Sequence, residues 1–254
     1  DDTAELYVTL QDLEGDRVDE TTDLFDSYTI RQPYDTAATC SLVHYDASTG
    51  TAVFQIQITQ WGGHRIEGSK ITFQVQEFLS HKTVYDDVEI PLSMSSLDQA
   101  QTQTVDNITG CSGAAVSEDV VSVLCPGAPM KEFPVRGIDV TAAGYVDGQL
   151  HVQTAVRDAL QNDNHSFLQL QGREGERLEA LYTVSFCNQW ESEGRVDYQE
   201  FVFDVPEAEI GQYQLIGTFT TSGMRTEGSW IVTFPMTNME AQSLESTSPM
   251  RKIH

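Results

Sequence analysis

Polar and apolar residues alternate with a period of two along most of this chain. The pattern is clear at residues 51–60 (TAVFQIQITQ) and 71–78 (ITFQVQEF), where most alternate residues are apolar. A period of two places successive side chains on opposite faces of a strand, whereas an amphipathic helix needs a period of 3.6. The helical period is rare here, so the sequence predicts a mostly β protein.

Turn residues separate the predicted strands. Residues 47–50 (ASTG) join 40–46 to 51–60, and Asp147-Gly148 joins 138–146 to 150–156. Each connection ends in Gly, which tolerates positive φ, so each predicts a hairpin. One helical turn is expected at 206–211, between a Pro and a Gly. Further strands are expected at 6–10, 25–30, 71–78, 83–90, 116–124, 167–170, 180–186, 198–205, 213–220 and 229–234.

A segment rich in Pro and Gly, residues 125–130 (CPGAPM), interrupts this pattern. Two prolines and a glycine cannot continue a strand ladder, so we place a domain boundary at 127–133. Several short strands on each side predict an all-β fold of two immunoglobulin-like β-sandwich domains in tandem. The expected domains are 1–128 and 129–238, followed by a loosely ordered tail at 239–254.

The chain is strongly acidic, with 39 Asp and Glu against 14 Lys and Arg, a net charge of -25. This charge repels a phosphate backbone and an anionic membrane surface, so nucleic acid is excluded as a partner. Residues 1–130 carry -16 and residues 131–254 carry -9, so the first predicted domain should hold most of the charge. With 39% hydrophobic residues the chain should fold, and it has no apolar stretch long enough to span a bilayer.

The four cysteines, Cys40, Cys111, Cys125 and Cys187, form no CxxC motif, which argues against a zinc ribbon or a thioredoxin-type site. Cys111 and Cys125 are open to two interpretations, a disulfide that closes a loop or two free thiols. Cys40 and Cys187 lie in apolar runs and are expected to pack in the core.

The familiar catalytic motifs GxSxG, HExxH, GxxxxGK[ST] and GxGxxG are absent, so we predict no enzyme, no cofactor and no catalytic residue. Two groups could in principle bind a metal, and for both we favour a structural interpretation. The first is an acidic turn, in which Gly15 stands at position 4 rather than 6 of a calcium loop. The second contains two histidines without the spacing of a ligand pair. The groups are Asp12, Glu14, Asp16, Asp19 and Glu20, and His151 and His165 with Asp158, Asp163 and Asn164.

Trp61 and Trp190 also have two interpretations, because each is followed by small or charged residues. An exposed indole could stack on the apolar face of a sugar, or it could cover the core at the mouth of a loop. The second arrangement is the more common one.

Three segments carry a family resemblance: VTLQDLEGDRVD at 8–19, YVDGQLHVQ at 145–153 and TEGSWIVTFP at 226–235. Together they resemble the extracytoplasmic region of a domain-of-unknown-function family of Gram-positive membrane proteins, which are likened to anti-sigma factors. The resemblance extends in short motifs over residues 5–236. It implies an extracellular location and an anchor in a transmembrane helix that these residues do not include, and it implies no catalytic residue. The motifs also have structural interpretations: Asp147-Gly148 as a turn, Gly228 as a bulge, and alternating core positions at Leu150, Val152, Trp230, Val232 and Phe234.

We therefore expect a non-catalytic, extracytoplasmic sensor region of a membrane-anchored regulatory protein, which binds a protein or small ligand at the cell envelope. The alternative is a cell-surface adhesion or carbohydrate-binding module. A neighbouring sigma-factor gene would favour the first, and a cell-wall sorting signal would favour the second.

Overall fold

The structure is a computed structural model that describes residues 2–13, 15–24, 28–31, 36–63, 66, 70–92, 100–113, 120–131, 133–190 and 193–235. The regular elements of the described residues are antiparallel strands and two short 3-10 helices, η2 (Ala159–Gln161) and η3 (Glu207–Gln212). The all-β prediction is confirmed. None of the described helices is long and apolar enough to cross a membrane.

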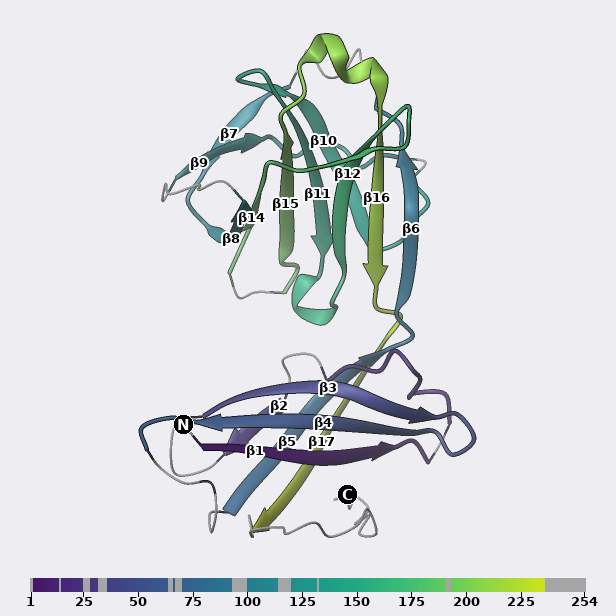
Figure 1. The fold of residues 1–254 in the computed structure, drawn as a ribbon, viewed down its shortest axis with the longest axis vertical. Coiled ribbons are helices and arrows are strands. Elements are labelled where there is room, and N and C mark those ends of the chain that lie inside the picture. The colour runs from purple at the N-terminus through teal and green to yellow at the C-terminus, as the bar shows by residue number, and fades with distance from the viewer. Residues whose placement is uncertain are drawn as a thin grey trace. The chain divides into compact units, whose positions relative to one another are not determined.

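The chain divides into two compact units (Figure 1). Unit 1 is made of Asp1–Lys82 and Ser222–His254, and unit 2 is Thr83–Thr221. Unit 2 is therefore inserted into unit 1, and the chain passes between them twice, after Lys82 and after Thr221.

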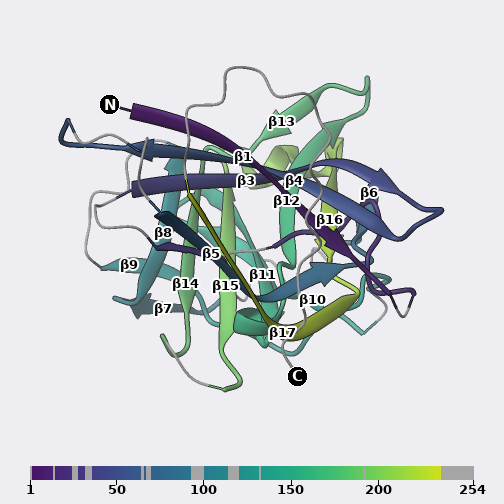
Figure 2. The same cartoon turned by 90° about the horizontal axis from the view of Figure 1, so that it is seen from below.

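Unit 1 is a sandwich of two three-stranded sheets. Figure 2 shows β1, β4 and β3 side by side. One sheet contains, in order, β1 (Asp2–Gln11), β4 (Thr51–Gln60) and β3 (Thr36–Asp46), and the other β17 (Met224–Pro235), β5 (Lys70–Ser80) and β2 (Tyr28–Arg31). The core contains Phe54, Ile56 and Ile58 of β4 and Phe73 and Val75 of β5. Burying each of these side chains contributes roughly 1.5–3 kcal/mol before the entropy of ordering is subtracted.

Unit 2 is a sandwich with an added ribbon. Its core joins Leu150, Val152 and Phe201 of one sheet to Leu168 and Phe219 of the other. The sheets contain, in order, β10 (Ile138–Val146), β11 (Gln149–Arg157), β15 (Val196–Phe203), β14 (Tyr182–Cys187) and β8 (Ile108–Gly113), and β13 (Arg177–Glu179), β12 (His165–Gly172), β16 (Tyr213–Thr221) and β6 (Thr83–Ile90). The ribbon pairs β7 (Thr102–Val105) with β9 (Val121–Leu124), and its Val105 and Val123 pack on Val184 and Phe186 of β14.

The two predicted hairpins are confirmed, β3 with β4 and β10 with β11. Asp147 and Gly148 have φ of 51° and 85°, as a type I′ turn requires. The expected bulge at Gly228 is also present, because the register shifts between Glu227 and Trp230. A Cβ on Gly228 would approach the Trp230 ring to 2.4 Å, so the ring lies over this glycine and would have to shift to admit a side chain.

The predicted boundary at residues 127–133 is not where the structure divides the chain. The NH of Gly127 donates to the Thr141 carbonyl and that of Met130 to the Val140 carbonyl, both at 3.0 Å, so the segment runs along β10. The prolines at 126 and 129 fall where no donor is needed. The domains are thus not 1–128 and 129–238, and the sandwiches are not in tandem, because β6 pairs with β16 and β5 with β17. The immunoglobulin-like assignment stays a prediction.

The sequence pattern predicts no strand between the predicted strands at 83–90 and 116–124, yet β7 and β8 lie there. The predicted strand at 116–124 is present at Val121–Leu124, and its first residues lie outside the described part of the chain. The expected tail at 239–254 lies outside the described residues as well.

Candidate functional site

The outer face of the sheet β1-β4-β3 is the best candidate for a binding surface. Its side chains are those of alternate residues on each strand, and the register aligns them in rows, such as Tyr7 with Gln55 and Ser41. We call this surface the Tyr7 face, and it comprises Thr3, Glu5, Tyr7, Thr9 and Gln11 of β1, Thr51, Val53, Gln55, Gln57 and Thr59 of β4, and Ala37, Thr39, Ser41 and, beyond a bulge, His44 and Asp46 of β3. Hydroxyl and amide groups dominate it, and its carboxylates are Glu5 and, at one end, Asp46.

Tyr7 stands at the centre of β1 with 56% of its surface exposed. Its hydroxyl donates to Glu5 Oε1, and Gln55 Nε2 donates to the same oxygen from the neighbouring strand. These bonds from Tyr7 and then Gln55 lower the pKa of Glu5, and the bond to Glu5 raises the pKa of Tyr7. The hydroxyl end of the ring is thus held in place, while more than half of the side chain stays exposed.

Both tryptophans proposed as sugar platforms are largely exposed. Trp61 is 49% exposed and follows β4 directly, and Trp190 of unit 2 is 54% exposed. Neither is sealed into a core, so the exposed-platform interpretation agrees better with their surroundings.

The acidic turn before β2 directs its carboxylates at the protein backbone. Asp12 Oδ2 accepts the NH of Arg17 at 2.7 Å. Asp19 Oδ1 accepts the NH and the hydroxyl of Thr21 at 3.0 and 2.8 Å, and Asp19 Oδ2 accepts the NH of His81 at 3.0 Å. Asp16 is exposed, and its Oδ1 lies 3.4 Å from His81 Nε2. Glu14 lies outside the described residues, and no three metal-binding side chains converge among those described.

Asp19 fastens the point at which the chain leaves unit 1. His81, at φ 56°, and Lys82 follow β5, and the NH of Lys82 donates to Thr21 Oγ1 at 2.8 Å. Lys82 Nζ also lies 2.8 Å from Asp23 Oδ2. A Cβ on Gly223 would come within 2.4 Å of the His81 carbonyl, so glycine is needed where the chain returns. The acidic turn therefore holds in place the segment at which the chain leaves unit 1.

Asp19 should make unit 1 sensitive to acid. Burial alone raises its pKa, but hydrogen bonds from Thr21 and His81 outweigh that effect and lower it below the usual 3.8. Its contribution is present above the unfolded pKa and is lost as pH falls through the lower folded value. We expect Asp19→Asn to flatten the loss of stability of unit 1 between about pH 5 and pH 2, measured by urea unfolding. Glu20→Gln, an exposed neighbour, is the control and should keep the wild-type slope; equal slopes in both variants would contradict the assignment.

The two histidines considered as metal ligands have different hydrogen-bond partners. His165 is exposed and its Nδ1 lies 3.0 Å from the Asp163 carbonyl. His151 is 4% exposed, and its Nδ1 lies 2.6 Å from Oε1 of the buried Glu200. Asp158 has φ 50° at the start of η2, where its carbonyl accepts from Asn162. His151 and His165 thus make separate contacts, in agreement with the structural interpretation favoured for them.

The Glu200 network was not expected from the sequence. Glu200 Oε2 accepts the NH of Leu124 at 2.9 Å and Gln153 Nε2 at 3.1 Å. Gln153 Nε2 also donates to the Leu124 carbonyl at 2.8 Å, and Thr141 Oγ1 donates to Gln153 Oε1 at 2.8 Å. Polar side chains of the five-stranded sheet therefore hydrogen-bond to both the NH and the carbonyl of Leu124, the last residue of β9.

The four cysteines are free. Cys111 is exposed and Cys125 is half-buried, and no disulfide joins them. Cys187 is buried, as expected. Cys40 packs against the unit 1 core, where burial and then Asp23 raise its pKa to about 12.

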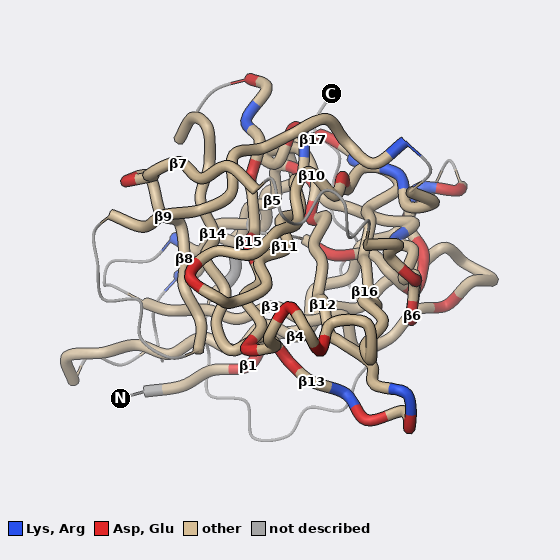
Figure 3. The backbone as a smooth tube through the Cα atoms, turned by 90° about the horizontal axis from the view of Figure 1, so that it is seen from above, with Lys and Arg blue, Asp and Glu red and all other residues tan. Residues whose placement is uncertain are grey.

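The division into units reverses the predicted distribution of charge. Unit 1 holds 17 acids and 8 bases, net -9, and unit 2 holds 22 acids and 6 bases, net -16. Unit 2 carries most of the net negative charge because its segment contains acidic residues from both predicted domains. Figure 3 shows Asp and Glu spread over many elements.

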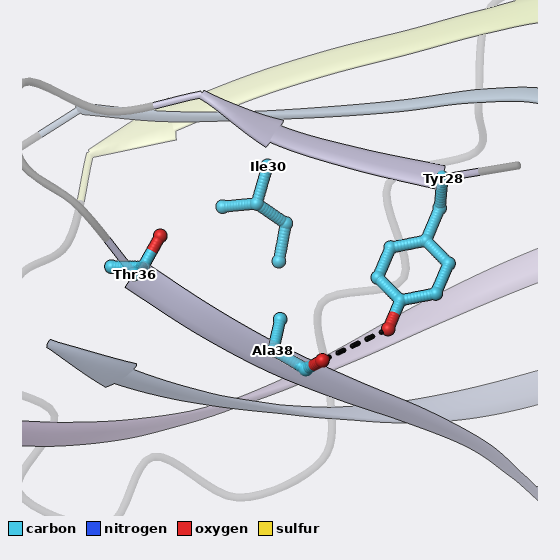
Figure 4. A pocket seen from close by; sticks show the side chains of 4 residues that line it. All are labelled: Tyr28, Ile30, Thr36 and Ala38. Atoms are coloured by element: carbon cyan, nitrogen blue, oxygen red, sulfur yellow. Dashed lines mark hydrogen bonds between the residues drawn. The ribbon is translucent and has the colours of Figure 1, made fainter. Parts of the chain in front are cut away.

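A cavity of about 240 Å³ lies between β2 and β3, lined by Tyr28, Ile30, Thr36 and Ala38 (Figure 4). Tyr28 crosses from one sheet to the other, and its hydroxyl donates to the Ala38 carbonyl at 3.1 Å.

No family model, curated protein or solved structure matches this chain.

Proposed function

We propose that this chain is a non-catalytic binding region on the extracytoplasmic side of a membrane, and that it binds its ligand through the Tyr7 face. The observation that carries the proposal is the exposed Tyr7 ring, held by Glu5 and Gln55 within a flat surface of hydroxyl and amide groups. Exposed aromatic side chains that are fixed in place contribute strongly to binding, because little conformational freedom is lost.

The charge of the face indicates the chemistry of the ligand. The chain carries -25 overall, yet the carboxylates of this face are already hydrogen-bonded, Glu5 to Tyr7 and Gln55, and Asp46 to Ser48 and Thr49. An uncharged, hydroxyl-rich polymer matches Thr, Gln and Ser side chains and can stack on the ring. We therefore favour a neutral polysaccharide of the cell envelope, which corresponds to the carbohydrate-binding alternative.

The membrane anchor and the regulatory role rest on the family resemblance. In this proposal the anchor lies outside these residues, and polysaccharide contact at unit 1 is the event that a regulatory protein of this kind would sense. A surface adhesin would use the same face without signalling. Both roles require polysaccharide binding at the Tyr7 face, so one binding experiment tests either of them.

Tyr7→Ala should weaken binding of the chain to an insoluble neutral polysaccharide by about tenfold or more, because the stacking surface is lost. Tyr7→Phe should bind more weakly than wild type but better than Tyr7→Ala, since it keeps the ring and loses the hydrogen bond that holds it. Co-sedimentation with purified cell-wall polysaccharide measures both. The matched control is Phe167→Ala, which removes a 46% exposed ring from unit 2 and should bind as wild type does. Equal binding by Tyr7→Ala and wild type would exclude the Tyr7 face.

A further inference from the structure

The open edge of β1 differs from every other sheet edge in the described part of the chain. β1 is the outermost strand of its sheet and pairs only with β4 (Figure 1). It has ten residues, contains no Lys or Pro, and keeps one register with β4 throughout. Charged side chains, prolines, bulges and short lengths are the features that keep edge strands from pairing with another chain.

The other described edge strands all have such protection. The longer ones, β3, β6, β8, β10 and β17, each carry an extra residue that shifts the register and makes a bulge. The remaining ones, β2, β7, β9 and β13, are three or four residues long. Among the described strands, β1 is therefore the long and regular edge that stays open to pairing.

The register shows which backbone groups of β1 face outward. The NH of Asp12 donates to the Gly50 carbonyl at 3.0 Å, directly after the pair Gln11 and Thr51. Hydrogen-bonded and non-bonded pairs alternate along an antiparallel ladder, so the even-numbered residues of β1 bond to β4. The odd-numbered residues direct their NH and carbonyl groups away from β4, to the open edge. These residues are Thr3, Glu5, Tyr7, Thr9 and Gln11.

The inward side chains at the start of β1 are incompletely covered. Val8 and Leu10 are each 7% exposed, whereas Ala4 and Leu6 are only half-buried, although both pack against the core of unit 1. A further strand beside β1 would cover the exposed parts of Ala4 and Leu6 and would pair the outward backbone groups.

We propose that this strand is β1 of a second copy of the chain, antiparallel to the first, with Leu6 on the two-fold axis. Thr3 then pairs with the partner's Thr9 and Glu5 with the partner's Tyr7, and the symmetric pairs form in the same way. These pairs exchange about eight backbone hydrogen bonds. On the inner face Leu6 meets the partner's Leu6 and Ala4 meets the partner's Val8, so the half-buried apolar side chains are covered.

Charge selects this register from its neighbours. With the axis at Leu6, the two acids Asp2 and Glu5 face the partner's Leu10 and Tyr7. An axis at Glu5 would place that carboxylate against the partner's Glu5, and an axis at Tyr7 would place Asp2 against the partner's Asp12. Like charges directly opposite each other destabilise a strand pair, so β1 is complementary to itself in the proposed register.

The dimer joins two three-stranded sheets into one sheet of six strands. Because odd-numbered residues pair with odd-numbered residues, both Tyr7 faces lie on the same side of it. Tyr7 is then diagonal to the partner's Tyr7, at about 7–8 Å between Cα atoms. The pairing itself does not depend on polysaccharide binding, and its test uses no polysaccharide.

Sedimentation velocity of the full chain measures the dimer. We expect a reversible monomer–dimer equilibrium that shifts toward the dimer with added sodium chloride, since each copy carries a charge of -25. Thr9→Pro removes an outward NH and no bond to β4, and it should weaken dimerisation by about tenfold or more. Thr9→Ala loses the same side chain but keeps the NH, so it is the matched control and should dimerise as wild type does.

Hydrogen exchange of the wild-type chain, resolved by NMR, locates the interface. The amides of Glu5, Tyr7 and Thr9 should exchange more slowly at high protein concentration than at low concentration. The amides of Leu6 and Val8 bond to β4 in both states, so their exchange should change much less.

Three results would overturn the proposal. The wild-type chain could stay monomeric at all concentrations. It could dimerise while the exchange of the odd-numbered amides of β1 stays independent of concentration, which would place the interface elsewhere. Thr9→Pro could dimerise as well as Thr9→Ala. If Thr9→Pro does not fold, the exchange measurement on the wild-type chain decides.

Discussion

Replacing Glu200 with leucine should destabilise unit 2 by about 3–5 kcal/mol, the usual cost of removing one member of a buried, hydrogen-bonded pair. Glu200 is 1% exposed, accepts the NH of Leu124 and a hydrogen bond from Gln153 Nε2, and its Oε1 lies 2.6 Å from His151 Nδ1. Without the carboxylate, the NH of Leu124 is left buried and unpaired, and Gln153 Nε2 keeps only its bond to the Leu124 carbonyl. Urea unfolding of the full chain, with hydrogen exchange at β9, measures the effect. The exchange protection of Val121–Leu124 should fall first, because Glu200 holds Leu124.

A triple variant distinguishes the net contribution of the network to stability from the destabilisation caused by removing Glu200 alone. Combining His151→Phe, Gln153→Leu and Glu200→Leu should recover the part of the loss that the unpaired side chains cause, whereas the part caused by the unpaired NH and carbonyl of Leu124 should remain. Glu209→Leu replaces an exposed glutamate of unit 2 and should change stability by less than about 0.5 kcal/mol. A loss below about 1 kcal/mol for Glu200→Leu would mean that water replaces the carboxylate and that the network does not hold β9 in place.

Local pattern was sufficient to predict most of the strands and the two hairpins, but not β7 and β8. The alternation at 51–60 marks β4, and the Asp147-Gly148 turn fixes the register of β10 and β11. Both features depend on neighbours in sequence. A turn that requires positive φ at two residues, and a strand with one buried face, leave few alternatives.

The division of the chain could not be predicted in this way, because it depends on pairs far apart in sequence. β5 pairs with β17 and β6 with β16, and no local signal marks these partners. The segment at 125–130 has the composition of a linker, yet it packs along β10 through bonds that avoid its prolines. Composition reveals where a ladder is interrupted but not whether the chain stays in the same core.

The site residues differ in how clearly the sequence indicates them. Trp61 was recognisable as a candidate platform, whereas Tyr7 needed the register to bring Gln55 beside it. Glu200 did carry a signal, a carboxylate directly before the buried run Phe201–Val202–Phe203. A polar residue in a core position is the pattern that identifies it.

The fragment that corresponds to unit 2 should fold when it is expressed alone, because its strands find all their partners within Thr83–Thr221. A fragment of residues 1–128 should not, since it contains β6 and β8 without β16 and β14. A fragment of 129–238 should fail for the same reason, as it contains β17 without β5.

Thermal unfolding of the three fragments tests the insertion of one sandwich into the other most directly. We predict a single cooperative transition and a dispersed amide NMR spectrum for residues 83–221, and neither for residues 1–128 and 129–238. Cooperative unfolding of 1–128 and 129–238, with an unfolded 83–221, would contradict the insertion and restore two consecutive domains.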